Sequence, residues 1–170
     1  AVRLIPAYIN GDGEKTIQEL IDKLNSDDLR EFGDKGKLSK VEIDDNTLKI
    51  IQLKGYKLET VLPKDEILYL KNSGNMALGA SSVDVTDTVH ESTKQIVERI
   101  SKILALNVAG IDILSQNIKL PLTENNAKVI EVNAAPDFRV HINPTVGISR
   151  YVQRNFMSMI FPQNSETDIK

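Results

Sequence analysis

The most informative stretch of this chain is Ile130-Glu131-Val132-Asn133-Ala134-Ala135-Pro136, read together with a second run upstream, Gly110-Ile111-Asp112-Ile113-Leu114. Each run is a short apolar string, typical of a β-strand, that contains a single carboxylate. A carboxylate is costly to bury unless a cation or hydrogen bonds compensate its charge. The two runs therefore predict a pair of strands whose acidic residues either bind something or face solvent.

Alternation of side chains along a strand places the polar residues of both runs together. Glu131 and Asn133 should share one face, with Ile130 on the opposite, apolar face. If the two strands are neighbours, Asp112 completes a cluster of oxygen ligands. Such a cluster, with few carboxylates, suits a Mg²⁺ ion that keeps some waters and binds phosphate. On spacing alone, a polar face that simply meets solvent is an equally good interpretation.

Composition sets the broad class of the chain. Its 170 residues are 41% hydrophobic and 26% charged, which is typical of a globular protein with a substantial core. The net charge of -3 argues against a general electrostatic attraction to nucleic acid or an anionic membrane, and no apolar run is long enough to cross a bilayer. The lack of cysteine excludes disulfides and thiolate sites and fits a reducing cytoplasm. The chain has only two histidines, His90 and His141, which argues against a zinc site or a serine–histidine triad.

The organisation of the chain predicts a piece of a longer protein. It begins inside what reads as a strand, without an initiator methionine. Residues 1–162 should form the structured part and residues 163–170 a flexible tail. Thr16 and Glu19 have capping-box spacing, which predicts the start of a helix. The charged, glycine-containing residues 26–39 are interpreted as a solvent loop.

A second segment that could bind a ligand is the glycine-containing loop of residues 72–82. Its small residues let a ligand approach the backbone closely, and successive N–H groups can bind an anion. The loop lacks the lysine and hydroxyl residue that complete a phosphate-binding P-loop, and glycine-rich loops are more often plain turns. Lys71 precedes the loop and is interpreted either as a phosphate partner or as a solvated charge.

Several motifs, taken in order along nearly the whole chain, resemble the C-terminal part of an ATP-grasp domain. The family with the closest resemblance is the cyanophycin synthetases; bifunctional glutathione synthetases and D-alanine–D-alanine ligases are the alternatives. The resemblance implies an α+β fold, with a mostly antiparallel sheet and helices packed on one face. The motifs that carry it are Arg3-Leu4-Ile5-Pro6-Ala7, Gly11-Asp12-Gly13, Tyr69-Leu70-Lys71, the loop of residues 75–82, Val83-Asp84-Val85-Thr86-Asp87, Val108-Ala109-Gly110-Ile111-Asp112, Ile130 to Pro136, Phe138-Arg139-Val140-His141, Pro144-Thr145-Val146-Gly147 and Phe161-Pro162.

The resemblance implies an ATP-dependent carboxylate–amine ligase. ATP would phosphorylate a carboxylate, and an amine would then displace phosphate from the acyl phosphate; in cyanophycin synthetases this step adds aspartate to a poly-aspartate primer. By motif, Asp112, Glu131 and Asn133 would hold the Mg²⁺ ions that bridge the ATP phosphates. The residues implied to cover the acceptor or acyl phosphate are Asn75, Gly79, Ala80, Ser81 and Ser82. The residues implied to meet phosphate or the substrate carboxylate are Arg3, Lys71 and Arg139.

The chain also departs from the family pattern. The family loop resembles Asn-Leu-Ser-Thr-Gly-Gly, where this chain has Asn75-Met76-Ala77-Leu78-Gly79-Ala80, and the family's Pro-Gly-Phe-Arg is here Pro136-Asp137-Phe138-Arg139. Lys71 stands where an arginine is usual. These changes leave a second functional class open, in which the chain is a non-catalytic module that retains the fold and serves as a scaffold.

The expected partners follow from the same resemblance. They are ATP, an amino-acid or peptide substrate and the remaining domains of the full-length chain, which would supply the nucleotide-binding lysine and the lid. The chain alone is therefore expected to be inactive. Neither nucleic acid nor membrane is expected as a partner, and a homo-oligomer is left open.

Overall fold

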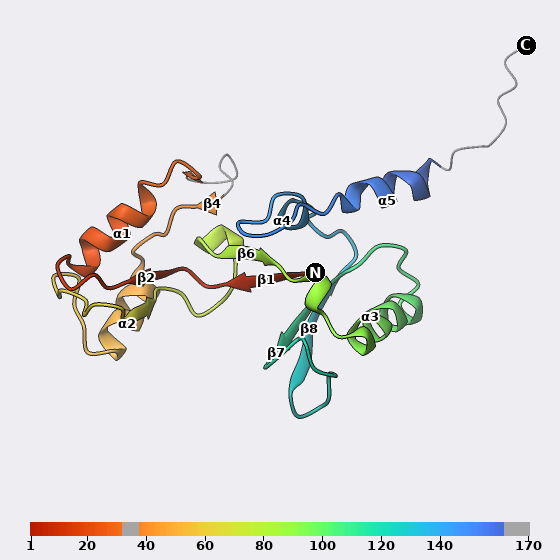
Figure 1. The fold of residues 1–170 in the computed structure, drawn as a ribbon, viewed down its shortest axis with the longest axis horizontal. Helices are drawn as coiled ribbons and strands as arrows, with labels where there is room; N and C mark the ends of the chain where they lie inside the picture. Colours follow the sequence, from red (N-terminus) through yellow and green to blue (C-terminus); the bar gives the residue numbers. More distant parts are fainter. Residues whose placement is uncertain (32–37, 162–170) are drawn as a thin grey trace, which may run out of the picture. The chain divides into compact units, whose positions relative to one another are not determined.

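The computed structural model of the protein describes residues 1–31 and 38–161 (Figure 1). The expected tail of residues 163–170 lies outside this part of the chain. The described chain divides into two compact units, which are considered separately. The N-terminal unit comprises Arg3–Val83; the C-terminal unit begins at Asp84 and also includes Ala1–Val2. Among the described helices, none has the length and apolar character needed to span a membrane.

The N-terminal unit is built from short strands and two helices. Antiparallel pairing joins β2 to β5, parallel pairing joins β3 to β4, and β1 is paired with β6. In order, its elements are β1 (Val2–Ile5), β2 (Tyr8–Asn10), α1 (Ile17–Asn25), β3 (Arg30–Glu31), β4 (Leu38–Ser39), α2 (Asp45–Leu53), β5 (Ile67–Tyr69), the 3-10 helix η2 (Met76–Leu78) and β6 (Ser81–Asp84).

Local sequence signals explain where the two helices begin. Thr16 caps α1 and forms the expected capping box with Glu19: the Glu19 N–H donates to the Thr16 hydroxyl, and the Glu19 carboxylate accepts from the Thr16 N–H. Asp44 caps α2 by accepting from the Thr47 N–H at 2.8 Å. Both caps satisfy backbone donors that a helix start leaves without partners.

The apolar faces of both helices pack with β2 and β5 in one core. The core residues share near-complete burial, and they are Ala7, Ile9, Ile17, Leu20, Ile21, Val41, Ile51, Leu62, Leu68 and Leu70. The interpretation of residues 26–39 as a solvent loop is wrong in part. Arg30 and Leu38 are only 7% and 6% exposed and lie on the paired strands β3 and β4. Residues 32–37 of that predicted loop lie outside the described chain.

The C-terminal unit contains one long hairpin and several helices. Its elements are the 3-10 helix η3 (Thr86–Thr88), α3 (Glu91–Ile103), β7 (Gly110–Ser115), β8 (Ala127–Asn133), α4 (Arg139–Ile142) and α5 (Val152–Ile160). The strands β7 and β8 pair antiparallel. The α+β class and the antiparallel pairing expected from the sequence are thus confirmed, although the described strands pair two by two rather than in one broad sheet.

Candidate metal site and substrate loop

The register of the β7–β8 hairpin brings the three expected oxygen ligands to one face. Asp112 lies directly opposite Glu131, and Gly110 lies directly opposite Asn133. Directly opposed residues of an antiparallel pair point to the same side, and alternation puts Asn133 on the side of Glu131. All three side chains are exposed. We call Asp112, Glu131 and Asn133 the oxygen trio.

The charges of the oxygen trio make this face suitable for a cation. Two carboxylates directly across from each other repel and destabilise a strand pair unless a positive charge lies between them. The described residues contain no group of three or more His, Cys, Asp or Glu placed to hold a metal; the oxygen trio offers two carboxylates and one amide. An oxygen-only set this small fits Mg²⁺ that completes its shell with water and phosphate.

A β-bulge corrects the expectation for Ile130. The pairing shifts after Asp112, so that Ile113 faces Val129 and Ile130 has no direct partner. Ile130 is 61% exposed and Val129 46% exposed, so neither belongs to a buried apolar face. A bulge inserts one residue into the strand and breaks the two-residue alternation on which the expectation depended. The oxygen trio is unaffected because it lies on one side of the bulge.

Gly110 keeps the segment after β8 close to the oxygen trio. A Cβ at Gly110 would lie 2.8 Å from the Pro136 Cβ and 3.7 Å from the Asn133 Cβ. A real side chain at this position would therefore push Pro136 away. The bare backbone of Gly110 is a site feature that the sequence pattern did not reveal.

An apolar pocket of about 390 Å³ adjoins this position in the C-terminal unit. It is lined by Gly110 and Pro136, and also by Phe138, His141 and Phe156 from the segments that follow β8. Burial lowers the pKa of His141, which favours its neutral form.

Arg139 is one of the expected partners of phosphate or carboxylate. It begins α4 and forms an ion pair with Asp137. Its Nη2 lies 2.7 Å from Asp137 Oδ2, and its backbone N–H donates to Asp137 Oδ1 at 2.8 Å. Both side chains are largely exposed, at 63% for Arg139 and 49% for Asp137. An exposed pair of this kind is weak, so another anion can compete for the guanidinium.

Lys71 has a structural partner, and its expected role at phosphate stays a prediction. The residue is 2% exposed, and its Nζ donates to Asp44 Oδ2 at 2.7 Å and to the Glu42 carbonyl at 3.0 Å. Hydrogen bonds from Lys71 and then from Thr47 hold the pKa of Asp44 well below its usual range. In this structure the ammonium group secures the N-terminal cap of α2.

We call residues 75–82 the substrate loop. Several backbone N–H groups of this loop donate hydrogen bonds to acceptors within the loop itself. The Ala77 N–H donates to the Asn75 side chain at 2.9 Å, and the next three N–H groups donate to the Asn75 and Met76 carbonyls. The expectation that successive N–H groups of this loop bind an anion is therefore corrected. Gly79, Ala80 and Ser82 are buried, whereas Ser81 is half-buried and Asn75 is exposed. Asn75 is the polar residue of this loop best placed to meet a substrate.

Arg3, the remaining expected site residue, has an exposed side chain on β1 of the N-terminal unit. The N-terminal unit thus holds Arg3 and the whole substrate loop, and the C-terminal unit holds the oxygen trio and Arg139.

A buried ion pair of the C-terminal unit was missed by sequence reasoning. The Arg150 Nε and Nη2 donate to Asp84 Oδ2 at 3.0 and 2.8 Å, and Nη2 also donates to Asp87. The Asp84 side chain is 5% exposed, and hydrogen bonds from Arg150 and then Thr86 hold its pKa well below the usual range. The motif around Asp84 was visible in the sequence, but its partner lies 66 residues away.

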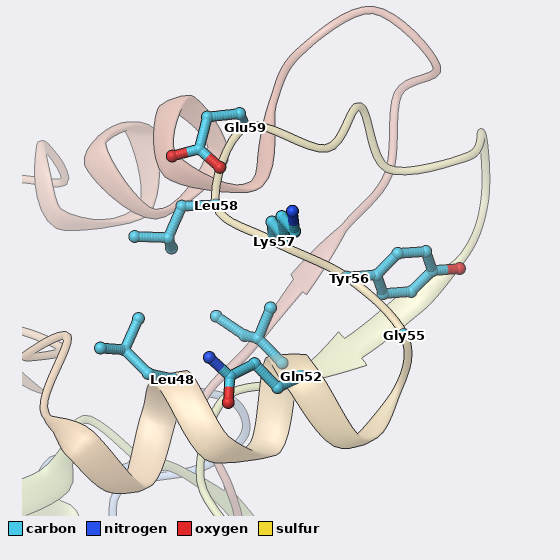
Figure 2. Close-up of a pocket in the computed structure, with 8 residues that line it drawn as sticks. Leu48, Gln52, Gly55, Tyr56, Lys57, Leu58 and Glu59 are labelled. Carbon is cyan, nitrogen blue, oxygen red and sulfur yellow. The ribbon is translucent and has the colours of Figure 1, made fainter.

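Another surface pocket, of about 520 Å³, lies in the N-terminal unit. It is formed by α2 and the segment that follows it. Figure 2 shows Leu48 and Leu58 pointing toward each other across it, whereas Tyr56 points away. The Tyr56 hydroxyl donates to the Glu66 carboxylate at 2.8 Å. The lining of this pocket contains none of the expected site residues.

Comparison with known proteins shows what the chain is similar to in sequence and in fold. No family model matches it. It is 40% identical over 165 residues to cyanophycin synthetase of Synechocystis sp., an alignment covering 97% of this chain and 19% of that protein. It is 33% identical over 163 residues to the glutathione biosynthesis bifunctional protein of Pasteurella multocida, covering 94% of this chain and 21% of that protein.

A solved structure gives the same answer for the fold. The chain matches the crystal structure of a bifunctional glutathione synthetase from Pasteurella multocida with a TM-score of 0.79 and 30% identity. The match covers 96% of this chain and 23% of that one. The resemblance to cyanophycin synthetases and the ATP-grasp fold are confirmed. The chain spans about a fifth of the length of the curated relatives it matches.

Proposed function

We propose that this chain contributes the Mg²⁺ ligands and part of the substrate site of an ATP-dependent carboxylate–amine ligase. The observation that carries the proposal is the oxygen trio, with Asp112 directly across from Glu131 on an exposed sheet face. A like-charged pair at this position destabilises the hairpin, and a bound cation would relieve that cost. The 40% identity to cyanophycin synthetase supports this reaction class.

The reaction has two steps. The substrate carboxylate takes the γ-phosphoryl group of ATP, which gives an acyl phosphate and ADP; an amine then attacks the acyl carbon, phosphate leaves with the bonding electron pair, and the amine loses a proton. Asp112, Glu131 and Asn133 would hold Mg²⁺, which when bound neutralises charge on the phosphates. Arg139 would bind the substrate carboxylate or the phosphate in place of Asp137, because a guanidinium forms paired hydrogen bonds with such groups.

The N-terminal unit would serve the substrate. Asn75 and the half-buried Ser81 of the substrate loop offer polar groups, and Arg3 adds an exposed positive charge. We propose aspartate and a poly-aspartate primer as the substrates, since the cyanophycin synthetases are 38–40% identical to this chain. The remaining domains of the full-length protein, in the cytoplasm, would complete the nucleotide site.

The direct test uses the full-length protein that contains this chain. We expect incorporation of labelled aspartate into a poly-aspartate primer that depends on both ATP and Mg²⁺. Asp112→Asn should reduce this rate by two orders of magnitude or more, whereas Lys94→Met, at an exposed surface pair with Glu91 in the same unit, should not change it. Incorporation that is independent of Mg²⁺ would contradict the proposal.

A second function, glutathione formation, is favoured by the structural match to a bifunctional glutathione synthetase. An assay of glutathione formation by the same protein distinguishes the two. A third candidate, a scaffold without catalysis, is favoured by the internal use of the N–H groups in the substrate loop. It predicts that neither substrate set is converted and that Asp112→Asn has no effect other than on stability.

A further inference from the structure

Arg30 lies almost fully buried beside the substrate loop. It belongs to β3 and is 7% exposed. Its Nη1 donates to the Ser39 carbonyl at 2.8 Å and to the Gly79 carbonyl at 3.0 Å. A single nitrogen atom therefore ties β4 to the C-terminal end of η2, where the chain enters β6.

The backbone at Gly79 is fitted closely against this guanidinium. Gly79 ends η2 in the left-handed conformation, with φ of 88°. A Cβ at this position would lie 2.6 Å from Val41 Cγ2, 3.2 Å from the Ser39 carbonyl oxygen and 3.3 Å from Arg30 Nη1. Only glycine can bring the loop this close to β4, so the turn and Arg30 form one tightly fitted arrangement.

The charge of Arg30 exceeds what a structural clamp requires. Among the described residues, no carboxylate forms a salt bridge with it, and its buried Nε has no hydrogen-bond partner. Burial lowers the pKa of Arg30 and Asp27 raises it, but a guanidinium stays protonated in proteins. A neutral donor would be enough to hold the two carbonyl groups. A buried cation that forms no salt bridge among the described residues attracts an anion to the neighbouring loop, because charges interact strongly where water is excluded.

We propose that Arg30 is a positioning residue for the substrate loop, holding the Gly79 turn in place and favouring a negatively charged substrate group beside Asn75. This inference rests on the proposed function, in which the loop covers the acyl phosphate or the acceptor carboxylate. It assigns to a buried arginine of β3 the task of keeping the loop ready for an anion. Arg30 itself does not touch the reacting atoms.

The chain offers a matched control for this role. Asn25 donates from Nδ2 to the Val41 carbonyl at 2.9 Å and accepts from the Val41 N–H at 2.8 Å. Asn25 thus holds the segment next to β4 with two hydrogen bonds, as Arg30 does, but none of the bonds described for it reaches the substrate loop. Asn25→Ala and Arg30→Gln should both lower stability, and only Arg30→Gln should disturb the loop.

The first experiment measures steady-state kinetics of the full-length protein. We expect Arg30→Gln to raise the KM for the carboxylate substrate at least tenfold, with kcat and the KM for ATP within twofold of the parent. Arg30→Lys, which retains the charge but not the guanidinium geometry, should recover only part of this loss. Asn25→Ala should give the parent KM. Equal KM values for Arg30→Gln and Asn25→Ala would overturn the inference, because they would assign Arg30 a purely structural role.

The second experiment separates this inference from the proposed function. Amide hydrogen exchange of Ala77, Leu78, Gly79 and Ala80 reports the loop directly, whether or not the enzyme turns over. We expect faster exchange at these amides in Arg30→Gln and in Arg30→Lys than in Asn25→Ala. Parent-like exchange in a folded Arg30→Lys protein would overturn the inference even if Arg30→Gln failed to fold. An absence of ligase activity in the parent, with the expected exchange pattern, would instead refute the proposed function.

Discussion

Replacing Lys71 by methionine separates a structural lysine from a phosphate-binding one. The side chain is 2% exposed, and its ammonium bonds to Asp44 and to the Glu42 carbonyl. Methionine keeps most of the packed volume but removes both hydrogen bonds. A hydrogen bond to a charged group contributes about 1.5–3 kcal/mol, and the Asp44 pair lies at the lower end because the Asp44 side chain is 44% exposed. We therefore expect Lys71→Met to cost about 1–3 kcal/mol of unfolding free energy.

The pH dependence of this loss adds a second check. Lys71 lowers the pKa of Asp44 below its unfolded value of 3.8, so the stabilisation is present above that pH and is lost as the pH falls through the folded pKa. The difference in stability between the parent and Lys71→Met should thus be greatest near neutral pH and should shrink below about pH 4. Urea denaturation of the chain, followed by circular dichroism at several pH values, measures it.

The kinetics of the full-length protein complete the test of Lys71. A structural lysine predicts that Lys71→Met, measured well below its melting temperature, keeps the parent kcat and KM for ATP. A variant with parental stability that has lost turnover would refute the structural assignment and would return Lys71 to the phosphate site.

Three further predictions concern the C-terminal unit. Gly110→Ala puts a methyl group 2.8 Å from the Pro136 Cβ and should reduce Mg²⁺-dependent turnover of the full-length protein severalfold, whereas an unchanged rate would mean that this contact does not shape the site. Ile130→Ala should cost less than about 1 kcal/mol in urea denaturation, because the residue is 61% exposed; a loss of about 2–5 kcal/mol, typical of a buried site, would contradict the bulge. Asp84 pairs with Arg150, which lowers the pKa of Asp84, so the stabilisation of the fold by this pair is lost as the pH falls below 3.8. Asp84→Asn should remove that part of the loss of stability in acid. An unaltered dependence of stability on pH in this variant would count against the role of the pair.

Features that depend on neighbours in sequence could be predicted well. The capping box of Thr16 and Glu19 lies within one turn of helix, and the structure has it as expected. The common face of Asp112, Glu131 and Asn133 follows from alternation and from the pairing of two adjacent strands. The capping box is contained in a few residues, whereas the common face also required the two strands to be neighbours, as the hairpin makes them.

Features that depend on distant partners could not be predicted. Lys71 looks like a solvated or phosphate-binding charge until Asp44, 27 residues away, is seen to bind it. Arg30 lies in a charged stretch, yet the carbonyl of Gly79, 49 residues on, helps to draw it into the interior. The exposure of Ile130 follows from a bulge, which is a relation between two strands rather than a property of one.

Glu131→Gln gives the most direct test of the central claim, that the oxygen trio binds the metal of a ligase. The substitution keeps the shape of the side chain and removes one of two opposed carboxylate charges. We expect the thermal melt of the full-length protein to stay unchanged or rise slightly, since the repulsion with Asp112 is relieved. Phosphate release at saturating ATP should fall by at least two orders of magnitude, with a higher Mg²⁺ concentration needed for half-maximal rate. Parental turnover with a parental Mg²⁺ dependence would contradict the account.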